Sequence, residues 1–209
     1  MKFLAVSDHT LPQLENSENL RKQFGDVEAV ISCGDLPAPY LEYLSSTLNT
    51  PLLFVRGNHD LMYEEAWPGG DNLHRHVLNF RGITFAGLEG SPLYNRGPIQ
   101  YTEGQMLRMV LAFAPRLLLR RMRLGYGLDV LVTHASPRDI HDRTDMAHRG
   151  FRSFRLFMNL YRPRYLLHGH VDKWDNRREF VTEFGTTTVI NINPMKLFTI
   201  EGKPRSGLG

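Results

Sequence analysis

Short apolar runs rich in β-branched residues alternate with longer stretches of helical periodicity in the first third of the chain. The apolar runs predict buried strands over residues 3–6, 27–32 and 52–55. The stretches between them predict helices over residues 17–24 and 36–48, the second with Pro37 near its start. This strand–helix order predicts parallel strands in one sheet, with helices packed on both of its faces.

The pattern changes in the rest of the chain. Residues 77–80 and 83–88 flank a short Arg81-Gly82 turn and predict a β-hairpin. Residues 102–123 predict either two helices or one kinked helix, because Pro115 interrupts the helical pattern. The remaining prediction is a helix over residues 149–161 and strands over residues 128–133, 165–168, 179–184, 186–192 and 197–201. We therefore expect a parallel or mixed first sheet and a more antiparallel second one.

Length and composition favour one compact domain over residues 1–209, since 42% of the residues are hydrophobic. No apolar run reaches the roughly 18 residues that a transmembrane helix needs. The apolar start of the chain is too short for a signal peptide and predicts a first strand instead. The single cysteine, Cys33, excludes an internal disulfide and is compatible with a reducing cytosol. These features favour a cytoplasmic protein.

The formal net charge of +3 reflects an arginine-rich stretch between Arg108 and Arg164. We interpret this stretch mainly as a solvated helical face with ion pairs. Attraction to nucleic acid is the less favoured alternative. Apolar positions between Met106 and Met122 predict core packing or a homo-oligomer interface, and a membrane-surface helix is less favoured.

Polar side chains follow five of the predicted strands. They are Asp8, Asp35, Asn58, His134 and His170. Loops at the carboxyl ends of strands in an open α/β sheet converge on one crevice, so these groups are expected to meet. Imidazole and carboxylate ligands suit manganese, iron or zinc, and a carboxylate can bridge two ions. The sequence therefore predicts a site for two divalent metal ions that would bind phosphoryl oxygen and activate water.

The order of these motifs resembles that of the calcineurin-like metallophosphoesterases. The motifs are Asp8, Gly34-Asp35, Gly57-Asn58-His59-Asp60, Thr133-His134-Ala135 and Gly169-His170-Val171-Asp172. The resemblance implies an α/β fold of four layers, a β-sandwich of two mixed sheets flanked by helices. It also implies a phosphodiesterase or phosphatase acting on a phosphoester substrate.

The resemblance also implies a role for each motif residue. Asp35 would bridge the two metal ions, and Asp8 would hold the first ion. The second ion would be held by Asn58, His134 and His170. His59 would contact the phosphate and assist the leaving group, with Asp60 orienting its imidazole.

The chain departs from the family pattern at the first metal position. The family's Asp-x-His is Asp8-His9-Thr10 here, and its Gly-His-x-His ends in Asp172. In the favoured hypothesis Asp172 replaces the lost histidine, which makes the site richer in oxygen and favours Mn²⁺ or Mg²⁺ over Zn²⁺. His9 ranks below Asp172, because adjacent side chains of a strand point to opposite faces.

Two alternatives to this hypothesis stay open. One is a single-metal protein with weak activity. The other is a scaffold or interaction protein with a vestigial site, for which a retromer subunit of this fold is a precedent.

Four further polar residues have less specific interpretations. Arg56 either binds a substrate phosphate or forms an ion pair with a neighbouring acid, and the sequence favours neither. His168 is expected to pack or to form a hydrogen bond rather than bind metal. His74 and His148 belong to no motif and are expected to face solvent.

Overall fold

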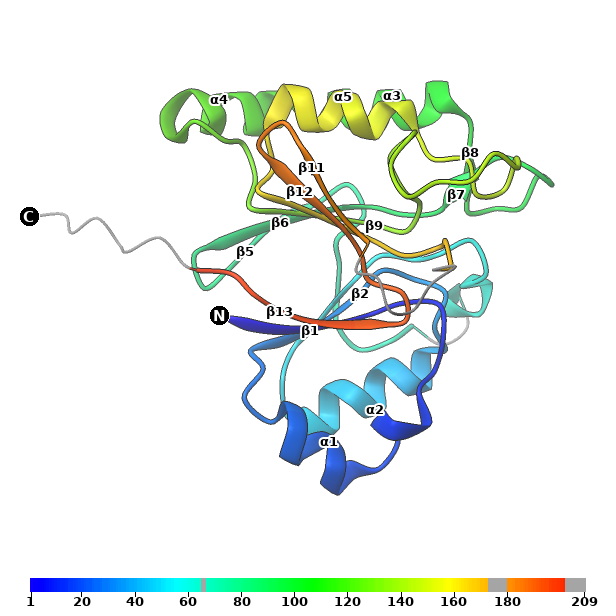
Figure 1. The fold of residues 1–209 in the computed structure, drawn as a ribbon, viewed down its shortest axis with the longest axis vertical. Helices are drawn as coiled ribbons and strands as arrows, with labels where there is room; N and C mark the ends of the chain where they lie inside the picture. The colour runs from blue at the N-terminus through cyan, green and yellow to red at the C-terminus, as the bar shows by residue number, and fades with distance from the viewer. Residues whose placement is uncertain (65–66, 173–179, 202–209) are drawn as a thin grey trace, which may run out of the picture.

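The computed structural model describes residues 1–64, 67–172 and 180–201. Two β-sheets face each other in the middle of the molecule, and helices cover the outer face of each sheet (Figure 1). In these residues no helix combines the length and the apolar character needed to cross a membrane.

The first sheet contains the parallel strands predicted from the first third of the chain. Its strand order is β13-β1-β2-β3-β4, with β13 antiparallel to β1 and the other neighbours parallel. The strands are β1 (Lys2–Val6), β2 (Ala29–Ser32), β3 (Leu52–Phe54), β4 (Asp71–Asn72) and β13 (Met195–Thr199). The helices on its outer face are α1 (Ser17–Phe24) and α2 (Ala38–Leu48).

The second sheet has a parallel centre and antiparallel edges. Its strand order is β11-β12-β10-β9-β6-β5. The strands are β5 (Val77–Phe80), β6 (Ile83–Leu88), β9 (Val130–Thr133), β10 (Tyr165–His168), β11 (Val181–Phe184) and β12 (Thr187–Asn191). The helices above it are α3 (Glu103–Ala112), α4 (Ala114–Leu124) and α5 (Arg152–Tyr161).

Smaller elements complete the described fold. A two-stranded sheet pairs β7 (Ser91–Pro92) with β8 (Gln100–Tyr101), and two 3₁₀ turns span Pro12–Leu14 and Leu61–Glu64. None of these elements was predicted, and neither was β4, because segments this short carry no usable periodicity.

The hydrophobic core has three layers, and the side chains of β1 pack into two of them. Phe3 and Ala5 point into the layer between the two sheets, whereas Leu4 and Val6 point toward α1 and α2. Successive side chains of a strand face opposite sides, so an uninterrupted apolar strand buries both faces. A third layer lies between the second sheet and α3–α5. The chain thus forms the expected four-layer sandwich of two mixed sheets flanked by helices.

Two details differ from the sequence-based expectation, and the alternative left open at Pro115 is decided. Both helices of the first third cover the same face of their sheet, because the second sheet covers the other face. Pro115 separates two helices rather than bending one, since it lies in the first turn of α4, where a missing N–H is tolerated. The last strand, β13, begins at Met195, before its predicted start at residue 197.

Candidate metal centre

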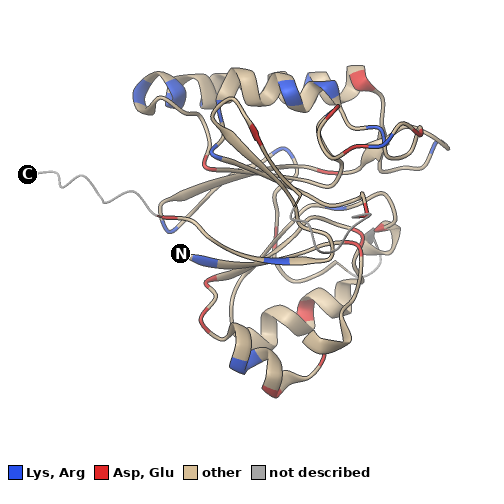
Figure 2. Ribbon diagram, viewed as in Figure 1, with Lys and Arg blue, Asp and Glu red and all other residues tan. Residues whose placement is uncertain are grey.

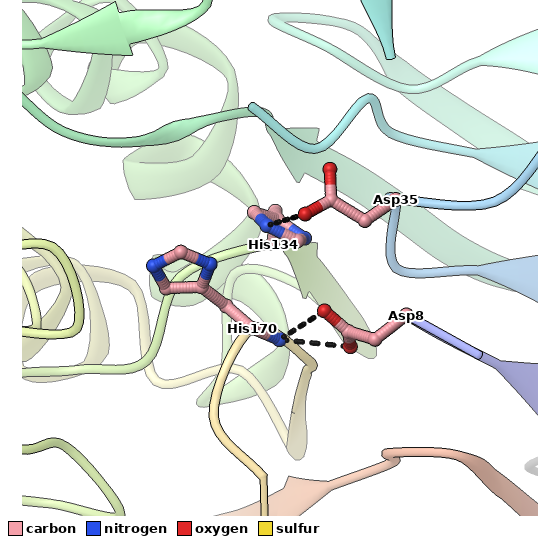
Figure 3. Close-up of side chains that lie close together, drawn as sticks. All are labelled: Asp8, Asp35, His134 and His170. Atoms are coloured by element: carbon pink, nitrogen blue, oxygen red, sulfur yellow. Dashed lines mark hydrogen bonds and ion pairs between the residues drawn. The ribbon is translucent and has the colours of Figure 1, made fainter. Parts of the chain in front are cut away.

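Loops that follow β1, β2, β3, β9 and β10 converge at one edge of the sandwich. Backbone hydrogen bonds tie them together: Asp8 N–H donates to the Gly34 carbonyl (3.1 Å), and Gly169 N–H donates to the His134 carbonyl (3.0 Å). Asp8, Asp35, His134 and His170 each bring one candidate ligand atom within 4.8 Å of the others. Figure 3 shows these four side chains directed toward a common point.

The His134 imidazole is fully buried and fixed at both nitrogens. Its Nδ1 lies 2.8 Å from the Cys33 carbonyl, which can only accept, so this nitrogen carries the proton. Its Nε2 faces the Asp35 Oδ2 at 3.2 Å and the Asn58 Oδ1 at 3.1 Å. A backbone carbonyl on one nitrogen and oxygen ligands around the other is the usual setting of a metal-binding histidine.

His170 is held by its other ring nitrogen, Nε2, rather than by Nδ1 as in His134. Its backbone N–H donates to both carboxylate oxygens of Asp8, at 3.1 and 2.9 Å. Its Nε2 lies 2.8 Å from the Ala147 carbonyl and therefore carries the proton, which leaves Nδ1 as the basic nitrogen. The two histidine rings lie 4.6 Å apart between centroids. Both imidazoles are thus held in the tautomer that suits metal binding.

The electrostatics of the centre favour a positive charge. Burial acts to lower the pKa of His134, yet the charge and hydrogen bond of Asp35, with the charge of Asp8, raise this pKa to about 9. Burial opposes ionisation of Asp35 as well, but His134 brings the pKa of its carboxyl down to about 2. The two carboxylates stabilise a positive charge here by more than its burial costs. Such a point suits a divalent metal ion.

Three of the candidate ligand residues have left-handed backbone conformations. The φ angles are 64° at Asp8, 58° at Asp35 and 66° at His170. Such conformations are costly for residues other than glycine and concentrate at functional sites. Gly169 allows the close approach here, because a Cβ at this position would lie 2.5 Å from the Asp8 Oδ2.

The described contacts of Asp60 are with backbone groups, a role that the sequence does not predict. Its carboxylate accepts backbone N–H groups of Asp35 (2.8 Å), Leu36 (3.1 Å) and Gly57 (2.7 Å). It therefore holds the loops after β2 and β3 together. His59 lies at the surface, and its backbone N–H donates to the Asp35 Oδ1 at 2.8 Å.

An open cleft of about 350 Å³ leads from the solvent to this centre. Its described lining consists of Asp8, His9, Asp35, His59, His148, His170 and Asp172. His9 and Asp172 bond to each other across the cleft, with His9 Nε2 2.9 Å from Asp172 Oδ1. Asp172 also accepts a hydrogen bond from the Asn193 Nδ2 (3.1 Å) and lies outside the group of four.

Strand alternation, which argues against His9 as a ligand, does not apply at this position. The left-handed conformation of Asp8 ends the alternation of β1 and lets His9 face the cleft together with Asp172. His148 also lines the cleft, with its ring 4.9 Å from that of His170, although it was expected to face solvent. No local sequence signal marks His148, because its loop is placed only by the fold.

The structure also shows the contacts of three residues outside the described lining of the cleft. Arg56 makes a two-point ion pair with the buried Glu89, through Nε–Oε2 (2.9 Å) and Nη2–Oε1 (3.0 Å), so the ion-pair alternative describes its contacts. His74 is not solvent-facing, since it packs beside Glu89 and Tyr101. His168 is buried and hydrogen-bonded to the Gly169 carbonyl and to His141, in line with the expected packing and hydrogen bond.

A comparison with protein families matches residues 1–194 to the calcineurin-like phosphoesterase superfamily domain. No curated protein matches the sequence. Among solved structures, TT1561 of Thermus thermophilus has a TM-score of 0.60 at 16% identity, over 91% of this chain and 88% of that one. A single mutant of Vps29 from Entamoeba histolytica has a TM-score of 0.45 at 12% identity, over 97% and 87% of the two chains.

Proposed function

The chain belongs to the calcineurin-like phosphoesterase superfamily, and on this premise we propose that it is a metal-dependent phosphoester hydrolase. The observation that carries the proposal is the cluster of two carboxylates and two imidazoles whose candidate ligand atoms lie within 4.8 Å of one another. The proposed metal ligands are Asp8, Asp35, Asn58, His134, His170 and Asp172. Two divalent ions, manganese by preference, are the proposed cofactors.

When bound, such ions would supply a Lewis acid for the phosphoryl oxygens and lower the pKa of a water molecule. Two side chains of the protein have further proposed roles. Asp35 lies between the His134 imidazole and the His59 backbone N–H, so it is fixed in place at the centre. The His59 side chain lies at the mouth of the cleft, where its ring can donate a proton to a leaving oxygen.

For the first metal position we propose that Asp172 acts as the substitute ligand. The support is its position in the cleft with Asp8, held by hydrogen bonds to His9 and Asn193. Asp172→Ala is expected to bind one Mn²⁺ fewer per chain than the wild type, as measured by elemental analysis after dialysis. His9→Ala separates the two candidates, and Asp26→Ala is the surface control, because this exposed aspartate pairs with Lys2. Unchanged stoichiometry in Asp172→Ala would contradict the assignment.

Hydrolysis of bis(p-nitrophenyl) phosphate in the presence of Mn²⁺ tests the proposed activity directly. Asp35→Asn is expected to lose essentially all turnover, because it removes the charge that faces His134. His59→Asn is expected to be slower by about 10²-fold or less, since p-nitrophenolate needs little protonation to leave. Asp26→Asn is the matched control, because this aspartate forms a surface ion pair with Lys2. Equal turnover by wild type and Asp35→Asn would overturn the proposal.

A binding platform is a second candidate function, favoured by the exposed face of α4. Leu119 is 49% and Met122 83% exposed, and Arg116 and Arg123 lie on the same helix. Exposed apolar side chains with basic neighbours on one helix suit a protein partner, including a second copy of this chain. Light scattering on the wild type and on Leu119→Asp/Met122→Asp tests this role. A monomer in both samples would exclude self-association through α4.

A further inference from the structure

A second cavity, of about 410 Å³, lies beside the metal centre and shares none of its described lining residues. It is formed by the two-stranded sheet β7–β8, the start of α3 and the loop that leads into α5. Its lining includes Leu93, Glu103, Arg138, Met146, Arg149 and Arg152. Its volume is within the range of small-molecule binding sites.

Arginine dominates the charge of this cavity. Among the described residues, neither Arg149 nor Arg152 forms an ion pair, and Arg138 reaches Asp139 and Asp142 only at 3.5 and 3.7 Å. The acid in the lining, Glu103, is already engaged, because it accepts the backbone N–H groups of Ser153 (2.7 Å) and Arg152 (3.2 Å). The guanidinium groups of Arg149 and Arg152 are therefore available to an anion, and guanidinium geometry suits the oxygens of a phosphate. Figure 2 shows basic residues along the helical layer that borders this region.

The same cavity has an apolar side. Leu93 and Met146 are 38% and 62% exposed, although side chains of this kind are usually buried. Exposed apolar side chains next to arginines suit a ligand that combines a flat or apolar group with a negative charge. A nucleotide has both features.

One short loop segment separates the cavity from the metal centre. Met146 and Arg149 line the cavity, whereas Ala147 and His148, between them in sequence, contact His170. The Arg143 guanidinium donates to the Asp172 carbonyl at 2.9 Å and fastens the same loop to the cleft. The cavity and the metal centre are therefore bordered by the same four-residue stretch of one loop.

We propose that this cavity binds the far arm of the substrate, and that the substrate is a nucleotide-type phosphoester carrying a second phosphate. The inference rests on the proposed hydrolase function, because the reacting phosphate would lie at the metal centre. Arg149 and Arg152 bind the second phosphate, and Leu93 and Met146 contact the base. Arg138 borders the same phosphate.

Two chromogenic substrates separate this subsite from the reacting centre. Thymidine 3′-phosphate 5′-(p-nitrophenyl phosphate) carries the second phosphate, and bis(p-nitrophenyl) phosphate does not. Arg149→Gln/Arg152→Gln is expected to raise KM for the nucleotide substrate by about 10-fold or more, with kcat and the reaction of the small diester unchanged. Arg116→Gln/Arg123→Gln on α4 is the matched control. Equal effects on both substrates, or none, would overturn the inference.

A binding measurement distinguishes failure of this inference from failure of the proposed activity. Thymidine 3′,5′-bisphosphate is titrated by calorimetry into the full chain in the presence of EDTA. Binding that Arg149→Gln/Arg152→Gln weakens by about 10-fold or more, and that Asp35→Asn leaves unchanged, supports the subsite even if no hydrolysis is found. Absence of binding, or binding equal in wild type and the arginine variant, contradicts the subsite even if the small diester is hydrolysed.

Discussion

Two aspartates of neighbouring motifs have different environments. Asp35 directs its charge at the His134 imidazole, and Asp60 accepts three backbone N–H groups from two loops. Burial raises the pKa of the Asp60 carboxyl to about 6, and the nearby charge of Asp35 acts in the same direction. Residue type and spacing do not separate these roles, because each depends on which donors the folded chain brings to the carboxylate.

His74 is expected to make the stability of the protein depend on pH. Burial lowers its pKa from 6.5 to about 4, against the opposing charge of Glu89. The Glu89 N–H donates to its Nδ1 at 3.2 Å, which requires the neutral ring. The unfolded chain binds more protons between these pKa values, so this stability is complete above pH 6.5 and lost as the pH falls to 4. The loss amounts to about 3 kcal/mol.

Urea unfolding between about pH 4 and pH 7.5 measures this dependence. His74→Gln removes the titrating group, so its free energy of unfolding is expected to depend less steeply on pH. The slope should fall by up to the equivalent of one bound proton. His76→Gln, at an exposed neighbouring position, serves as the control. A His74→Gln slope equal to that of the wild type would show that His74 does not titrate as inferred.

The elements above the second sheet begin and end at recognisable signals. Thr102 and Gln105 form a capping box at the start of α3, and Gly125 ends α4 in a left-handed conformation (φ 82°). The apolar faces of α3, α4 and α5 then fix these helices on the sheet. Local signals therefore set where the helices begin and end, and packing sets where they lie.

Removing the cap of α3 tests how much this local signal contributes to stability. Thr102→Ala loses the acceptor for the Gln105 N–H and is expected to lower the free energy of unfolding by roughly 1 kcal/mol. Urea denaturation of Thr102→Ala and of the exposed loop variant Thr144→Ala provides the comparison. A loss no larger than that of Thr144→Ala would mean that packing alone holds the start of α3.

On the scale of the whole molecule, both sheets contribute candidate ligands. Asp8 and Asp35 follow strands of the first sheet, and His134 and His170 follow strands of the second. A metal ion at this point would link the two halves of the sandwich and would bind the folded chain only. Metal binding is therefore expected to stabilise the entire fold rather than one loop.

Thermal unfolding with and without Mn²⁺ tests this link. At about 100 times the dissociation constant, Mn²⁺ is expected to add about 2.7 kcal/mol to the free energy of unfolding. EDTA should reverse the gain, and Asp35→Asn should abolish it. An equal gain in Asp35→Asn would place the ion elsewhere on the chain.

The sequence by itself determined the alternation of strands and helices in the first third and the set of polar residues at strand ends, and the order of its motifs implied the four-layer class through the family resemblance. These features depend on periodicity and on motifs within a few residues of one another, which are visible without a fold. Only the tertiary structure paired His9 with Asp172, 163 positions apart, and Arg56 with Glu89. It also turned His148 toward His170. These contacts join side chains from separate loops, and the meeting of such loops is decided by how the sheets pack.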